Sequence, residues 1–247
     1  MGMAGHSKWS NIKHRKAGQD AKRAKVFTKI IRELTVAARD GGGNPEDNPS
    51  LRSVIEKAKS AQMPKDTMER AIIRGAGGDD GEQLIALTYE GYGPGGVAVI
   101  VETMTDNRNR TVAEVRHAFS KAGGSLGTDG SVSYLFEKKG VLRFNSIEQE
   151  DEIIEIAIDN GAEEVETLGD QSTEITTSVD DYAALKKALA EGGFEATSGE
   201  ITLVARSLNS LDHSTSIKVL GLLDALEDLD DVTAVHCNGQ FAESFTG

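Results

Sequence analysis

Residues 87–103 have the sequence LTYEGYGPGGVAVIVET, and they mark the point where the hydrophobic period of the chain changes. Two runs rich in apolar and β-branched residues, 87–92 and 97–103, flank Gly93-Pro94-Gly95-Gly96. Such runs, joined by a short glycine-rich turn, are typical of a β-hairpin. The segments before the hairpin repeat with a helical period, so the sequence predicts both helices and antiparallel strands.

Three helices are predicted on the N-terminal side of the hairpin. The first covers residues 20–39 and ends at a glycine cluster followed by Pro45. The second begins at Asn48-Pro49, where asparagine caps the helix and proline takes its first position, and it breaks at Met63-Pro64. The third covers 65–74. The glycines of 75–81 then predict a linker, so we expect residues 1–78 to form a basic N-terminal arm and a helical domain.

The region after the hairpin predicts an α+β arrangement. Residues 107–122 favour a helix and 131–136 a strand, and residues 140–205 follow the order βαββαβ, which is that of a ferredoxin-like unit. A helix over 217–226 and a strand over 232–236 complement the hairpin. We therefore expect a discontinuous α+β domain made of 82–139 plus 206–247, with 140–205 inserted into it.

Composition excludes several classes of protein. The chain has 247 residues and a net charge of −13, and its 38% hydrophobic content argues against overall disorder. No apolar run is long enough to span a bilayer, and the polar, basic beginning does not resemble a secretory signal. The single cysteine, Cys237, excludes a disulfide framework and a cysteine-based zinc site, and fits a reducing compartment. We expect a cytoplasmic protein that does not enter a membrane.

Charge is distributed unevenly along the chain. Residues 1–32, the basic segment, hold nine basic side chains and one acidic one, whereas residues 79–247 hold 11 basic and 32 acidic ones. This asymmetry is typical of a protein that meets a polyanion with one end. The alternative is that the basic segment balances the acidic body within the molecule.

Helical spacing divides the predicted first helix into two faces. Its apolar side chains gather on one face, and these are Phe27, Ile30, Ile31 and Leu34. Its cations gather on the opposite face, and these are Lys22, Lys25, Lys29 and Arg32. One face is therefore expected to enter a core while the other lines up positive charge.

Cations and aromatic rings together suggest contact with nucleic acid, because cations bind phosphates and rings stack on unpaired bases. The candidate binding residues in the basic segment are Lys8, Trp9, Lys13, His14, Arg15, Lys16, Lys22, Arg23, Lys25, Lys29 and Arg32. A second, weaker cluster comprises Arg108, Arg110, Arg116 and Lys121, and its three arginines are further candidate binding residues. For Trp9, an equal alternative is that it anchors the arm to the helical core.

No pattern in the sequence supports catalysis or metal binding. Ser10 to Lys13 match S-x-x-K, but the partner motifs of that serine chemistry are absent. Gly91 to Gly96 lack the Gly-Lys-Ser/Thr of a phosphate loop. The five histidines show no metal-ligand spacing. We therefore predict no enzyme, no catalytic residues, no metal and no cofactor.

Several strings resemble the YebC/PmpR family. They are MAGHSKWSNIKHRK (3–16), DAKR (20–23), FTK (27–29), EGYGPGG (90–96), DNRNRT (106–111) and GSLGTDGSV (124–132). The resemblance implies a three-domain protein with an N-terminal helical domain and two ferredoxin-like α+β domains. It also implies a cytoplasmic bacterial regulator that binds promoter DNA. Mitochondrial relatives are translational activators, and bacterial members are linked to relief of ribosome stalling.

Two functions stay open on the sequence. The first is a DNA-binding transcriptional regulator, and the second is an RNA- or ribosome-binding translation factor. Both would use the same cations, and no helix-turn-helix spacing is recognisable. A third, an interaction scaffold whose acidic domains bind the partner, would not require the basic segment.

Overall fold

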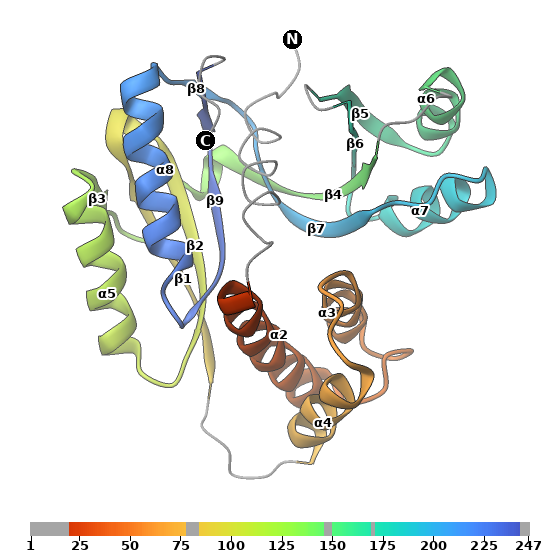
Figure 1. Ribbon diagram of the computed structural model, residues 1–247, viewed down its shortest axis with the longest axis horizontal. Helices are drawn as coiled ribbons and strands as arrows, with labels where there is room; N and C mark the ends of the chain where they lie inside the picture. Colours follow the sequence, from red (N-terminus) through yellow and green to blue (C-terminus); the bar gives the residue numbers. More distant parts are fainter. Residues whose placement is uncertain (1–19, 78–83, 146–149, 169–170, 243–247) are drawn as a thin grey trace.

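The structure is a computed structural model that describes residues 20–77, 84–145, 150–168 and 171–242. The side chains of residues 20–24 and 150 are not part of this description. Within the described ranges the chain forms a helical part, a first sheet and a second sheet (Figure 1). The α+β class expected from the sequence is confirmed.

The helical part consists of α2 (Asp20–Gly41), α3 (Pro49–Ser60) and α4 (Lys65–Ala76). Ile30 and Leu34 of α2 are buried with Leu51 of α3 and Ala71 of α4 in one hydrophobic core. These inward positions repeat at helical spacing, as the sequence predicts. Helix α4 continues through Gly75 and Ala76, the first two residues of the predicted linker, and residues 78–81 of that linker lie outside the described ranges.

Asn48 ends the connection between α2 and α3. Its Oδ1 accepts a hydrogen bond from the Leu51 backbone N–H at 3.0 Å, which is the predicted helix cap. Its Nδ2 donates to the carbonyl oxygens of Ala37 and Gly42, both at 2.8 Å. The buried amide therefore fixes the start of α3 against the end of α2.

The first sheet has the strand order β3-β1-β2-β9 and is antiparallel throughout. Its strands are β1 (Ile85–Tyr92), β2 (Ala98–Thr105), β3 (Ser125–Leu126) and β9 (Val232–Cys237). The helices α5 (Arg108–Lys121) and α8 (His213–Glu227) lie side by side on one face (Figure 1). Val99, Phe119 and Leu223 are fully buried in the core between helices and sheet.

The predicted hairpin is present. Tyr92 pairs with Ala98, and a short 3₁₀ turn, η1 (Pro94–Gly96), connects the strands. Gly95 and Gly96 have φ angles of +70° and +74°, which side chains rarely tolerate. The backbone conformation of this turn therefore explains why glycine occupies positions 95 and 96.

The second sheet has the order β5-β6-β4-β7 and the expected βαββαβ sequence of elements. These are β4 (Phe136–Phe144), α6 (Glu150–Asp159), β5 (Ala162–Thr167), β6 (Thr173–Thr177), α7 (Tyr182–Glu191) and β7 (Ser198–Ala205). Leu142, Ile175 and Leu185 are fully buried between this sheet and its helices.

One predicted strand is wrong. Residues 131–136 do not form a separate strand, because β4 begins at Phe136 and follows a short 3₁₀ turn, η2 (Ser133–Leu135). The cause is Glu90, whose carboxylate accepts hydrogen bonds from the backbone N–H groups of Gly130, Val132 and Ser133 at 2.7–2.8 Å. The expected boundary between residues 139 and 140 consequently falls inside β4.

The parts of the structure also contact one another. Phe136 and Ala205, at the ends of β4 and β7, pack with Ala98 and Ile100 on the free face of the first sheet. The strands β8 (Asn209–Ser210) and β10 (Gly239–Gln240) form a small parallel pair nearby. Among the described helices, none combines the length and the apolar character needed to cross a membrane.

Candidate nucleic-acid interface

The predicted binding residues fall into three groups. Those in the arm lie outside the described ranges, and they are Lys8, Trp9, Lys13, His14, Arg15 and Lys16. Lys22 and Arg23 lie in the first turns of α2, where only the backbone is described. Side chains are described for Lys25, Lys29, Arg32, Arg108, Arg110 and Arg116.

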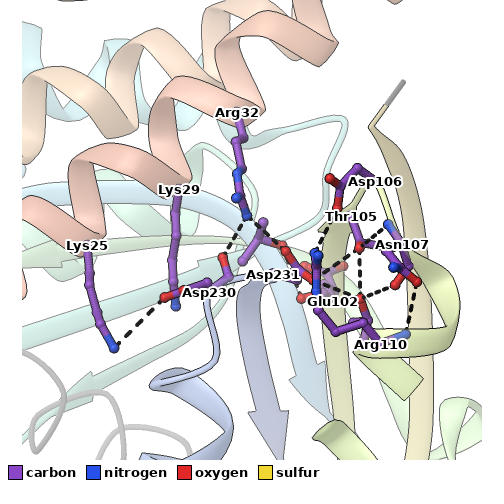
Figure 2. A network of polar contacts seen from close by, with 12 residues as sticks. Lys25, Lys29, Arg32, Glu102, Thr105, Asp106, Asn107, Arg110, Asp230 and Asp231 are labelled. Carbon is purple, nitrogen blue, oxygen red and sulfur yellow. Dashed lines mark hydrogen bonds and ion pairs between the residues drawn. The ribbon is translucent and has the colours of Figure 1, made fainter. Parts of the chain in front are cut away.

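Lys25, Lys29 and Arg32 line one face of α2, as the helical spacing predicts, and reach the end of α8 (Figure 2). Lys25 Nζ donates to the Asp228 carbonyl oxygen at 3.0 Å, and Lys29 Nζ to the Glu227 carbonyl oxygen at 2.5 Å. Arg32 Nη1 donates to the Asp230 carbonyl oxygen at 2.9 Å. The row of cations thus contacts residues 227–231, which we call the acidic turn.

The acidic turn attracts these cations for two physical reasons. It carries four carboxylates in the sequence Glu-Asp-Leu-Asp-Asp, and it begins where α8 ends. The last carbonyl groups of a helix have no partner within the helix and carry partial negative charge. The last turn of α8 has no basic residue of its own, so the cations come from α2.

Asp231 is the buried centre of the contact, with a side chain only 3% exposed. Its Oδ1 lies 3.1 Å from Arg32 Nη1. Its Oδ2 lies 2.8 Å from both Arg110 Nη2 and Thr111 Oγ1, and 3.0 Å from Thr105 Oγ1. Burial alone would raise the pKa of Asp231, but hydrogen bonds from Arg110, Thr111 and Thr105 outweigh it and lower the pKa below its ordinary value.

Arg110 binds two carboxylates at the start of α5. Its Nη2 lies 2.7 Å from Asp106 Oδ1 and 2.8 Å from Asp231 Oδ2. The hydrogen bonds that Arg110 donates to Asp231 and then to Asp106 raise its pKa further above the ordinary value. The side chain of Arg110 thus joins α5 to the acidic turn. Its backbone N–H donates to Asn107 Oδ1, which caps the start of α5.

A hollow of about 480 Å³ lies between α2, α5 and the acidic turn. Its lining includes three cationic and five acidic side chains, namely Lys25, Arg32, Arg110, Asp106, Glu114, Asp228, Asp230 and Asp231, together with Leu229. Both signs of charge face the same space, so the hollow is a polar junction between parts of the chain.

Arg108 and Arg116 are exposed on α5, away from the acidic turn's hydrogen bonds. Arg108 lies near Tyr89 of β1. Burial raises the pKa of Tyr89, and the charge of Arg108 acts in the opposite direction. Both arginines are predicted binding residues that lie on the surface, where the side chains of Lys25 and Arg110 are also exposed, at 49% and 43%.

Two observations concern metal ligands and the cysteine thiol within the described residues. No group of three or more His, Cys, Asp or Glu side chains there is arranged to hold a metal ion. Cys237 is buried, and burial raises the pKa of its thiol to about 11, so the nucleophilic thiolate is scarce at neutral pH.

The sequence alone does not identify the acidic turn as a partner of the basic segment. The available signal was four carboxylates at a helix end that lacks its own cation. At Lys25, Lys29 and Arg32 the geometry corresponds to the alternative in which basic and acidic regions balance within the molecule. Binding of nucleic acid by these residues stays a prediction.

Two family models match the chain. One, described as the TACO1/YebC protein N-terminal domain, matches residues 7–78. The other, described as the TACO1/YebC second and third domain, matches residues 84–239. Together they cover the helical part and both sheets.

Relatives match over almost the whole length. A "Probable transcriptional regulatory protein" of Hahella chejuensis is 57% identical over 241 residues, covering 98% of this chain and 97% of the relative. The "Transcriptional regulatory protein PmpR" of Pseudomonas aeruginosa is 54% identical with the same coverage. A crystal structure of a conserved hypothetical protein from Aquifex aeolicus is 48% identical and has a TM-score of 0.83, covering 92% of this chain and 94% of that one.

Proposed function

Because the chain belongs to the TACO1/YebC family, we propose that it is a nucleic-acid-binding regulatory protein, and specifically a DNA-binding transcriptional regulator. The observation that carries the proposal is the separation of charge along the chain. The basic segment holds nine cations and one acid, whereas residues 79–247 hold 32 acids and 11 cations. A polyanion is attracted by the first and repelled by the second. The relatives named as transcriptional regulators support the same function.

The phosphate contacts in this proposal come mainly from the beginning of the chain. The contributing cations are Lys8, Lys13, Arg15, Lys16, Lys22 and Arg23, and the rings of Trp9 and His14 supply stacking surfaces. Arg108 and Arg116 offer a second exposed positive surface on α5. Phosphate contacts of this kind fix position on the polymer and carry no sequence information directly.

The second candidate is an RNA- or ribosome-binding translation factor. It is favoured by the orientation of α2, whose Lys25, Lys29 and Arg32 contact the acidic turn. In this arrangement that cationic face is not presented to a major groove, which leaves recognition of backbone and shape. The same recognition suits structured RNA.

The deciding experiment is crosslinking in cells followed by sequencing of the attached DNA and RNA. Promoter fragments enriched over ribosomal and messenger RNA are the result expected for the transcriptional regulator. Enrichment of ribosomal RNA would overturn that function in favour of the translation factor. A variant in which Lys8, Lys13, Arg15 and Lys16 are each replaced by Glu serves as the control, because it keeps the core residues of α2, and crosslinks that survive it would assign binding to another part of the chain.

A further inference from the structure

The contacts between α2 and the acidic turn resemble those between a protein and a phosphate backbone. Three cations spaced along one helix face meet a chain segment that presents oxygen atoms in a row. Lys25 also lies 3.9 Å from the Asp228 carboxylate and 4.0 Å from the Asp230 carboxylate. A phosphodiester backbone likewise presents oxygen acceptors at regular intervals, and each of its phosphates carries a full negative charge.

Much of this contact is accessible to solvent and therefore replaceable. The side chain of Lys25 is 49% exposed, and those of Asp228 and Asp230 are 73% and 79% exposed. Exposed ion pairs contribute little to stability and weaken as salt rises. A polymer that carries many phosphates competes effectively with such pairs.

Release of α2 would not leave Asp231 unpartnered. Arg32 approaches its Oδ1, whereas Arg110 and Thr105 approach its Oδ2 (Figure 2). Thr111 Oγ1 also donates to Oδ2. If Arg32 withdraws, the Oδ2 partners remain on α5 and β2. The buried carboxylate therefore has a permanent set of donors and one removable donor, which limits the cost of opening.

The helical part also has a core of its own. The core residues of α2, α3 and α4 form a separate cluster from those of the two sheets. The contacts to the rest of the chain include polar ones, such as Arg39 Nη1 to the Leu84 carbonyl oxygen at 3.1 Å and Lys186 Nζ to Glu56 Oε2 at 2.8 Å, and α3 also lies against β7. A part with its own core can move as a unit when the contacts that attach it are exchanged.

We propose that the acidic turn is an intramolecular substitute for a phosphodiester backbone, and that bound nucleic acid displaces it from Lys25, Lys29 and Arg32. After the turn has been displaced, Lys25, Lys29 and Arg32 of α2 contact phosphates of the bound polymer. In the closed form the turn masks the face, so the apparent affinity is reduced by the fraction of molecules that are closed. This inference rests on the proposed function, because it requires a nucleic-acid ligand.

The test neutralises the turn without touching the cations. In the Asp228→Asn/Asp230→Asn variant, two exposed carboxylates are removed. The matched control is Asp151→Asn/Glu152→Gln on exposed positions of α6, which changes the net charge equally. The probes are a labelled random-sequence DNA duplex and a labelled RNA hairpin at low salt. We expect the turn variant to bind about three- to tenfold more tightly than the control.

Opening is measured directly by the distance between spin labels at Ser53→Cys on α3 and Ser120→Cys on α5, both exposed. The buried Cys237 is left in place. The labelled protein with the wild-type turn is expected to give mainly the shorter distance alone and the longer one with DNA, and the labelled turn variant to show a larger fraction of the longer distance without DNA. Equal affinities of variant and control, or an unchanged distance in the DNA complex, would overturn the displacement while leaving the proposed function intact. No binding by any variant would overturn both.

Discussion

At the scale of single residues, two buried carboxylates organise the chain around them. Asp231 accepts hydrogen bonds from side chains of α2, β2 and α5. Glu90 accepts hydrogen bonds from the backbone N–H groups of Gly130, Val132 and Ser133. Burial would raise the pKa of Glu90, but hydrogen bonds from Val132, Gly130 and Ser133 lower it. Both groups are therefore held as anions by donors that come from distant parts of the sequence.

Asp231→Asn is expected to destabilise the protein by about 2 kcal/mol at neutral pH, because an amide cannot satisfy all of the donors around it. The pKa of Asp231 is lowered from 3.8 in the folded state. The ionised carboxylate therefore stabilises the fold when the pH is above the pKa that Asp231 has in the unfolded chain. This stabilisation is lost as the pH falls through the lower pKa of the folded state.

The measurement is urea unfolding of wild type and variant between about pH 7 and pH 2. The difference in unfolding free energy should shrink as the solution becomes acidic. Asp230→Asn, at a 79% exposed side chain, is the control and should change stability by less than about 0.5 kcal/mol. A difference that is constant across this pH range would show that the charge of Asp231 does not stabilise the fold.

At the scale of elements, close approach between α2 and α4 depends on Gly75. A Cβ atom at this position would collide with the Thr35 carbonyl oxygen and lie 3.0 Å from the Ala38 Cβ. Gly221 in α8 is the opposite case, because a Cβ atom there would meet nothing within 4 Å. Two glycines inside helices thus have different packing constraints.

The two glycines give a paired prediction. Replacing a helical glycine by alanine favours the helix by up to about 1 kcal/mol when there is space. We expect this gain for Gly221→Ala. At Gly75→Ala the collision with backbone prevails, and we expect a net loss of about 1–3 kcal/mol. Thermal unfolding of both variants checks the signs, and stabilisation by Gly75→Ala would contradict the packing described for α2 and α4.

Many elements could be predicted from the sequence because their signals are local. Asn48 caps α3 as expected, and the helical spacing of Ile30 and Leu34 identifies the inward face of α2. The strand expected over 131–136 failed because Glu90, far away in sequence, binds that backbone. Local propensity contains no information about such a distant acceptor.

At the scale of the whole molecule, the sequence predicts the family, the fold class and the cationic face of α2, but not the segment that this face contacts. Family and fold class follow from strings and periodicity, and both are confirmed. The cationic face of α2 was also identified, but its partner was not, since Arg32 and Asp231 are 199 positions apart. The buried carboxylate, the cations of α2 and the end of α8 come together only when the chain has folded, so no local sequence pattern shows this contact. The partition of the chain at residues 78, 139 and 205 stays a prediction.

The distribution of charge over the molecule also determines how strongly salt concentration affects the affinity for nucleic acid. The basic segment and the acidic turn attract each other, and both interact with any phosphate polymer nearby. Binding through four or five phosphates would give a slope of about −4 in a plot of log affinity against log salt. Affinity would then fall about a hundredfold between about 50 and 200 mM salt.

The most direct measurement is therefore the salt dependence of DNA-duplex binding for two variants with equal charge changes. In one, Lys8, Lys13, Arg15 and Lys16 are each replaced by Glu, and in the other Lys138, Lys187, Arg206 and Lys218, all outside the basic segment, are replaced in the same way. We expect the first variant to lose most of the affinity and of the salt slope, and the second to keep the slope of wild type. Equal slopes for both variants, or binding by wild type that does not respond to salt, would contradict a basic N-terminal segment that binds nucleic-acid phosphates.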